Sequence, residues 1–195
     1  MPHLQPGMTV GLFGGSFNPP HEGHLLVAKL ALQRLGLDQL WWLVTPGNPL
    51  KSGNGLAPLA ERLALSDSMA GDPRIRVTAI EKTLGTAYTA RTIRHIIRRN
   101  PAVNFVWIMG ADNLGDFHRW QEWRRIAATV PLAVIDRPGA TLTYLSSKAA
   151  RTLDRARVPE RAARALPRMK PPAWTFIHGP RSAVSSTALR LENKR

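Results

Sequence analysis

The sequence contains no cysteine among its 195 residues, and only 13 acidic side chains stand against 27 lysines and arginines. Without cysteine the chain forms no disulfide and offers no thiolate to a metal ion. No apolar run approaches the roughly 20 residues that cross a bilayer, and the first seven residues lack the basic and apolar regions of a secretory signal. These absences exclude disulfide-rich and membrane-spanning classes and predict a cytoplasmic protein.

The positive charge is unevenly distributed along the chain. From residue 137 to residue 195 there are 13 lysines and arginines and 3 acidic residues. Such a bias suits anionic substrates or nucleic acid, and it is also found on surfaces that are simply solvated. Charge therefore limits the partners without choosing among them.

Length and patterning predict one domain over residues 1–195, with a flexible start at 1–7 and a basic helical or irregular segment at 140–172. Apolar runs typical of buried strands alternate with segments of helical periodicity. The predicted strands are 8–13, 40–44, 75–79, 103–109, 131–135 and 174–177, and the predicted helices are 25–35, 57–70, 89–99, 120–128, 144–156, 160–166 and 188–192. This order favours a Rossmann-like α/β fold with a doubly wound, mostly parallel sheet, whose ligands bind beyond the carboxyl ends of the strands.

The segment 8–24 combines a strand, a glycine loop and a helix start. Gly14 and Gly15 allow the backbone to turn and to approach a ligand closely. His21 and His24 lie on one face of the first helical turn, where the free N–H groups favour an anion. The segment predicts a phosphate site in which both imidazoles donate hydrogen bonds. The alternative is that His21 only caps the helix and His24 is an ordinary surface histidine.

Two further segments offer polar groups to phosphate or ribose. The hydroxyls of Ser185, Ser186 and Thr187 precede a predicted helix with Arg190 on its next turn, an arrangement that suits polyphosphate or a plain helix cap. Asp112 follows a predicted strand, where a carboxylate can hold a ribose hydroxyl, hold a metal-bound water, or cap a helix.

These motifs resemble a known family. The string Gly-Gly-Ser-Phe-Asn-Pro-Pro-His-Glu-Gly-His over 14–24 resembles the signature of bacterial nicotinate-nucleotide adenylyltransferases, and its His-x-Gly-His core is shared by a wider nucleotidyltransferase superfamily. The string Val-Ser-Ser-Thr-Ala-Leu-Arg over 184–190 resembles a second signature of that family. Weaker likenesses at Gly110-Ala-Asp, Phe117-His-Arg-Trp, Ala87-Tyr-Thr and Arg137-Pro-Gly extend the resemblance from Gly11 to Arg190.

The resemblance implies adenylyl transfer from ATP to nicotinate mononucleotide, giving nicotinate adenine dinucleotide and pyrophosphate in NAD biosynthesis. It implies catalytic roles for His21 and His24, contact with the mononucleotide through Tyr88, Thr89 and Trp120, and Mg²⁺ that is held mainly by substrate phosphates, without a dedicated protein site. It implies that ATP and its phosphates are bound by Gly14, Gly15, Ser16, Phe17, Lys51, Gly110, Asp112, Arg137, Ser185, Ser186, Thr187 and Arg190.

The chain departs from the family pattern at two places. Arg91 stands where relatives usually have Asp, and Leu50-Lys51 replaces a more usual His-Lys. The sequence leaves the consequence of the first change open, and a changed local helix cap is one alternative to a change in the chemistry. The second puts the role of the Lys51 loop in doubt, because only the charge of the lysine is left to meet phosphate.

Three alternatives remain beside this interpretation. A sister adenylyltransferase could use nicotinamide mononucleotide or phosphopantetheine as the acceptor. A basic nucleic-acid-binding protein without turnover is disfavoured, because the basic region has only Tyr144, Trp174 and Phe176 for base stacking. A catalytically dead relative is disfavoured by the intact histidine pair. The sequence leaves open the oligomeric state, the preference for acid over amide and the role of 140–172.

Overall fold

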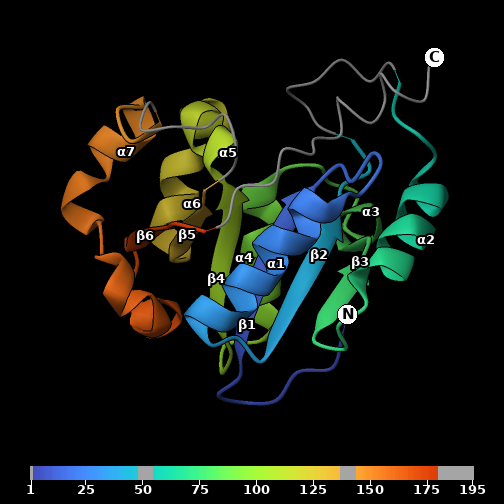
Figure 1. The fold of residues 1–195 in the computed structure, drawn as a ribbon, viewed down its shortest axis with the longest axis horizontal. Coiled ribbons are helices and arrows are strands. Elements are labelled where there is room, and N and C mark those ends of the chain that lie inside the picture. Colours follow the sequence, from blue (N-terminus) through green and yellow to red (C-terminus); the bar gives the residue numbers. More distant parts are fainter. Residues whose placement is uncertain (1, 48–54, 137–143, 180–195) are drawn as a thin grey trace.

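The computed structural model describes residues 2–47, 55–136 and 144–179 and contains a six-stranded sheet (Figure 1). The strands are β1 (Thr9–Gly15), β2 (Gln39–Val44), β3 (Ile75–Thr78), β4 (Asn104–Gly110), β5 (Leu132–Ile135) and β6 (Trp174–Ile177). Their order is β3-β2-β1-β4-β5-β6, and every neighbouring pair is parallel. The predicted Rossmann-like parallel sheet is confirmed.

Helices cover both faces of this sheet. They are α1 (Glu22–Leu35), α2 (Leu59–Ala70), α3 (Ile80–Thr83), α4 (Thr89–Arg99), α5 (Ala111–Asp116), η1 (Phe117–Arg119), α6 (Trp123–Thr129), α7 (Lys148–Thr152), η3 (Asp154–Ala156) and η4 (Glu160–Arg168). In Figure 1, α1 lies in front of the sheet and α4 lies behind it. None of the helices in the described ranges is long and apolar enough to cross a membrane.

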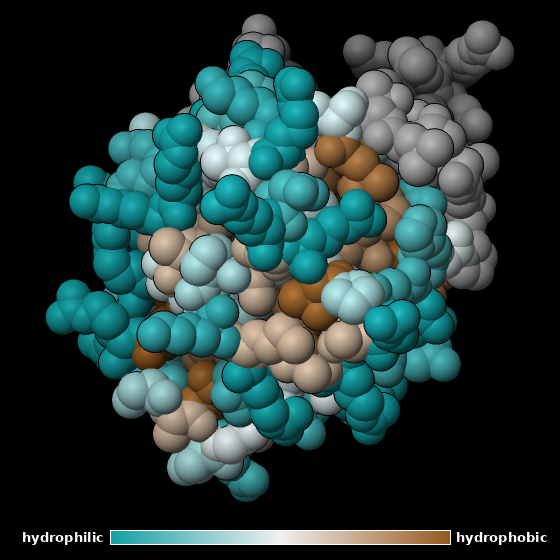
Figure 2. Space-filling view, turned by 90° about the vertical axis from the view of Figure 1, so that its left-hand side faces the viewer, coloured by the Kyte–Doolittle hydropathy of each residue, from teal (hydrophilic) through white to brown (hydrophobic). Residues whose placement is uncertain are grey.

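The strands are apolar on both faces because both faces are buried. Consecutive tryptophans of β2 show this, since Trp41 packs in the layer under α4 and α6, whereas Trp42 packs in the layer under α1. Both indoles are fully buried. Strand side chains point alternately to opposite faces, so a strand covered on both sides has no polar alternation. The surface outside is mostly hydrophilic on the side that Figure 2 shows, with only small hydrophobic areas.

The strand order reverses beside β1. The chain first builds β2 and β3 on one side of β1 and then crosses to build β4 on its other side. Such a reversal opens a crevice beyond the carboxyl ends of the two central strands. The residues at those ends are Gly15 of β1 and Gly110 of β4.

Several predicted helices differ from the structure at their ends. The helix predicted at 120–128 begins only at Trp123, because Glu122 has a φ of 55°, in the left-handed region that a helix cannot contain. The helix predicted from residue 57 begins at Leu59, after Pro58. The short helices predicted at 144–156 and 160–166 are replaced by α7, η3 and the 3₁₀ helix η4. The helix predicted at 188–192 lies outside the described residues.

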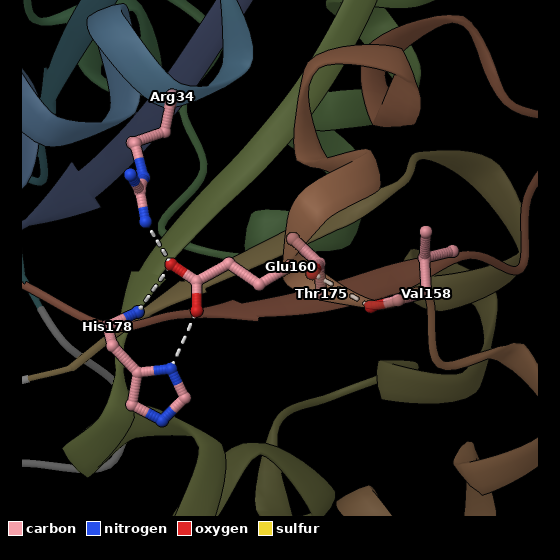
Figure 3. Close-up of polar contacts among 5 residues, drawn as sticks. All are labelled: Arg34, Val158, Glu160, Thr175 and His178. Carbon is pink, nitrogen blue, oxygen red and sulfur yellow. Dashed lines mark hydrogen bonds and ion pairs between the residues drawn. The ribbon is translucent and has the colours of Figure 1, made fainter.

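Polar contacts attach the end of β6 to α1 and η4 (Figure 3). The Glu160 carboxylate accepts hydrogen bonds from Arg34 of α1 and from the backbone and ring of His178, with a ring Nδ1–Oε2 distance of 2.7 Å. Gly179 lies so close to α1 that a Cβ there would be 2.5 Å from Leu30. The chain therefore leaves β6 pressed against the helix that carries the histidine pair.

Gly14 lies within β1, so the turn predicted at Gly14 and Gly15 begins only after them, and packing is what requires this glycine. A Cβ on Gly14 would lie 2.6 Å from the ring of Trp107, which is 1% exposed and has no room to move. We predict that Gly14→Ala lowers the free energy of unfolding by about 1–3 kcal/mol, as overpacking of a core does. Chemical denaturation measures this. The control is Gly47→Ala, where a Cβ meets nothing within 4 Å; equal stability of the two variants would contradict the packing argument.

Candidate active site

Both histidines of the 14–24 motif cap the start of α1. His21 is the N-cap residue, in an extended conformation, and its Nδ1 accepts a hydrogen bond from Gly23 N at 3.1 Å. The His24 Nδ1 accepts in turn from His21 N at 3.2 Å. The two rings lie 3.9 Å apart between centroids, and both side chains are more than nine-tenths buried.

This reciprocal capping fixes the protonation pattern of the rings. An Nδ1 that accepts a hydrogen bond leaves the single proton of a neutral imidazole on Nε2. The alternative interpretation, that His21 caps the helix, therefore holds for its Nδ1 atom. It does not exclude a chemical role, because the cap occupies Nδ1 and orients Nε2–H as a donor.

An aromatic cluster supports the histidine pair from the side of the sheet. The ring of His24 lies 4.7 Å from that of Phe17, which stacks on Trp42 at 5.0 Å and meets Phe13 edge-on at 5.7 Å. Phe17 has a φ of 45°, a strained value for a bulky residue. Its fully buried ring holds that conformation, so Phe17 shapes the loop through packing.

Arg62, which no sequence motif indicates, ties the loop after β1 to its neighbours. The Arg62 side chain is buried and donates to the carbonyl oxygens of Ser16 at 2.6 Å, Thr45 at 2.8 Å and Ala57 at 2.9 Å. Burial lowers the pKa of its guanidinium. No carboxylate of the described residues pairs with it, so the fold places an uncompensated positive charge beside the loop. Nothing in its spacing distinguishes Arg62 from the exposed arginines.

Asn18 makes a second attachment between the same segments. Its Nδ2 donates to Gly55 O at 2.8 Å, and its Oδ1 accepts from Ala57 N at 3.0 Å. The loop after β1 is thus joined to residues 55–57, which follow the Lys51 loop in the chain. Lys51 itself lies outside the described residues, as do Arg137, Ser185, Ser186, Thr187 and Arg190.

The predicted mononucleotide residues lie at the start of α4 and after η1. Tyr88 is the N-cap of α4 without a side-chain cap hydrogen bond, and it is 40% exposed. Thr89 begins the helix and is half-buried. Trp120 is half-buried and meets the ring of Trp107 edge-on at 6.2 Å.

Trp107 connects the two halves of the candidate site. The same indole that packs under Gly14 also supports Trp120. The end of β1 and Trp120 therefore both pack against a single buried side chain of β4. Trp123, by contrast, is buried in the core, as expected for a structural residue.

Gly110 and Asp112 lie where β4 passes into α5. Gly110 ends the strand and is the N-cap residue of α5, and Asp112 lies in the first turn with its side chain exposed. Asp112 is therefore not the N-cap residue that was one interpretation of its sequence position. Within the described ranges no group of three or more histidines and carboxylates could hold a metal ion.

Comparisons with known proteins show the family to which the chain belongs. The model of the cytidylyltransferase-like family matches residues 12–192. A Rhizobium johnstonii protein named "Probable nicotinate-nucleotide adenylyltransferase" is 68% identical over 97% of this chain and 96% of its own length. The chain belongs to the nicotinate-nucleotide adenylyltransferase family. It is thus a nucleotidyltransferase.

Further relatives support the family and the fold. A Mesorhizobium japonicum protein of the same name is 65% identical over 97% of both chains. The structure of Plasmodium falciparum nicotinic acid mononucleotide adenylyltransferase complexed with NaAD superposes with a TM-score of 0.72 at 16% identity, covering 94% of this chain and 83% of that one. At that identity the likeness concerns the fold alone.

Within the adenylyltransferase fold, Arg91 lies on the outer face of α4. Together with Arg94, His95, Arg98 and Arg99 it lines a hollow of about 460 Å³. These five residues recur at helical spacing opposite the buried face of Ile93 and Ile96. Arg91 therefore adds positive charge to an exposed surface of α4.

We predict that Arg62→Met lowers the free energy of unfolding by about 2–5 kcal/mol, because three buried carbonyl groups lose a charged donor. Chemical denaturation measures the loss. The matched control is Arg74→Met, whose exposed guanidinium pairs only with Asp72, and this variant should unfold like the wild type. A similar loss in both variants would show that Arg62 has no special structural role.

Proposed function

We propose that the protein transfers the adenylyl group of ATP to nicotinate mononucleotide, producing nicotinate adenine dinucleotide and pyrophosphate. The observation that carries this proposal is the histidine pair, capped through Nδ1 at the start of α1 and beside the carboxyl end of β1. Relatives that are 65–68% identical bear the name of this activity. Adenylyl transfer is what such donors at a strand–helix junction are suited to assist.

The reaction joins two phosphates without a covalent enzyme intermediate. A 5′-phosphate oxygen of the mononucleotide attacks the α-phosphorus of ATP, an O–P bond forms, and the bond to the β-phosphate oxygen breaks to release pyrophosphate. The attacking oxygen is already anionic, so the protein needs to align the reactants and stabilise the charge of the transition state. Nε2–H of His21 and of His24 would supply that stabilisation, because the N–H groups of Gly23 and His24 are already bonded to His21 within the cap.

The remaining predicted residues receive their proposed roles from the resemblance to the family, and six of them, Lys51, Arg137, Ser185, Ser186, Thr187 and Arg190, lie outside the described residues. Trp120 would stack on the pyridine ring, and the turn at Tyr88 and Thr89 would receive its carboxylate. ATP and its phosphates would be held by Gly14, Gly15, Ser16, Phe17, Lys51, Gly110, Asp112, Arg137, Ser185, Ser186, Thr187 and Arg190.

Mg²⁺ would be held mainly by the phosphates. It prefers oxygen ligands and keeps several waters, and the exposed Asp112 carboxylate fits a contact through such a water. When bound, the ion neutralises phosphate charge.

The proposed acceptor is tested by measuring pyrophosphate release from ATP and Mg²⁺ with three acceptors in parallel. We predict the highest kcat/KM with nicotinate mononucleotide, a lower value with nicotinamide mononucleotide, and no release above background with phosphopantetheine. Preference for phosphopantetheine, or no release with either mononucleotide, would refute the proposed function.

The role of the histidine pair is tested with two substitutions at His24. His24→Ala and His24→Asn should each lower kcat on the order of 100-fold or more, the usual effect of losing one transition-state donor. The Asn side chain keeps a short acceptor for the His21 N–H and loses the Nε2–H, so His24→Asn should also keep the wild-type melting temperature. The control is His3→Ala, an exposed histidine before β1. Near-normal kcat in a folded His24→Asn enzyme would rule out the catalytic role.

A further inference from the structure

Glu81 is a buried carboxyl group to which the proposed mechanism gives no role. It lies in α3, is 4% exposed, and its Oε1 accepts a hydrogen bond from Thr92 Oγ1 at 3.2 Å. Its main-chain oxygen accepts from Thr86 N at 3.0 Å. Glu81 thereby holds both ends of the segment 86–92, which contains Tyr88 and Thr89.

The second carboxyl oxygen of Glu81 lacks a hydrogen bond of good geometry. Oε2 is buried and makes no hydrogen bond with the described residues. The Thr45 hydroxyl interacts with the carboxyl and also bonds Gly47 O at 2.7 Å, and the Thr92 hydroxyl also bonds Tyr88 O at 3.3 Å. Each hydroxyl has one hydrogen for two acceptors, so neither is a full donor to the carboxyl. A protonated Glu81 can donate to Thr45 Oγ1 and complete this chain of hydrogen bonds. An ionised Glu81 leaves a buried anionic acceptor without a full donor, which is costly.

Burial is also the main influence on the acidity of this group. It raises the pKa of Glu81, against smaller opposing effects of the Thr45 and Thr92 hydroxyls. No charged side chain in the described ranges contributes, although Lys82 of α3 and Arg91 of α4 are near in sequence and exposed. The polar groups that contact the carboxyl are therefore two hydroxyls, that of Thr45 after β2 and that of Thr92 in α4.

The start of α4 is otherwise suited to an anion. Its first turn contains no acidic residue, and its N-cap Tyr88 makes no side-chain cap hydrogen bond. When Glu81 is neutral, no negative charge in the first turn opposes the positive end of α4 at Tyr88 and Thr89. An ionised Glu81, hydrogen-bonded to Thr92 of α4, places a negative charge near the start of that helix. This charge repels a carboxylate bound there.

We propose that Glu81 is a positioning residue that sets the preference for a carboxylate-bearing acceptor over its amide, with the neutral acid favouring the carboxylate and the ionised acid opposing it. This inference rests on the proposed function. A merely structural Glu81 would support the turn equally for both acceptors, so the ratio of the two activities separates these roles.

The experiment is the ratio of kcat/KM for nicotinate mononucleotide to that for nicotinamide mononucleotide, measured from pH 5.5 to 9.5. Both acceptors carry the same phosphate, so its titration and that of ATP cancel in the ratio, and the nicotinate carboxylate is ionised throughout. We expect the wild-type ratio to fall on the order of tenfold as pH rises, the effect of one unit charge roughly 10 Å away at a protein-like dielectric constant.

Glu81→Gln supplies the neutral comparison, because it keeps the shape of the side chain without its charge. Its ratio should stay constant across the range, equal the wild-type ratio at low pH and exceed it at high pH. The control is Asp67→Asn, an exposed carboxyl of α2, which should follow the wild-type profile. Melting temperatures confirm that each variant is folded.

A wild-type ratio that is independent of pH overturns the inference, and this result needs no variant. A Glu81→Gln ratio that falls in parallel with the wild type overturns it as well. Both results presuppose that nicotinate mononucleotide is a substrate. Absence of turnover with that acceptor at every pH would instead mark failure of the proposed function.

Discussion

Two backbone N–H groups at the start of α1 determine the orientation of both imidazoles. Because His21 and His24 each accept one of these hydrogen bonds through Nδ1, the helix cannot begin without turning the two rings into a fixed pair. Structure and proposed chemistry therefore depend on the same atoms. The cap stabilises α1, and it leaves the donor of each neutral ring on the opposite nitrogen.

Other contacts of the fold fix the segment that leads to this pair relative to its neighbouring loops and to Trp120. Arg62 and Asn18 fasten the loop after β1 to the loop after β2 and to residues 55–57. Trp107 packs under Gly14 and also supports Trp120. The hydrogen bonds are partly shielded from water and the Trp107 contacts are buried, so they are worth more than fully exposed pairs of the same length.

The sequence predicted those structural features, the strands above all, that depend on local residue patterns. Apolar runs bounded by Gly and Pro predicted every strand to within two residues, and β6 at 174–177 is identical in prediction and structure. The buried roles of Arg62 and Glu81 could not be predicted, because a charged residue in a helix looks the same in sequence whether it faces water or the core. The late start of α6 depends on the positive φ of Glu122, which its residue type does not reveal. The proposed polyphosphate residues at 185–190 lie outside the described residues and stay a prediction.

The most direct test of the account is a crystal structure with nicotinate mononucleotide and an ATP analogue that has a methylene group between its α- and β-phosphates. The account predicts that Nε2 of His21 and of His24 lies within about 3.2 Å of oxygens of the reacting phosphates, with Ser185, Ser186 and Thr187 on the phosphates that leave. Phosphates bound away from both imidazoles, or segment 185–187 in a separate cavity, would contradict it.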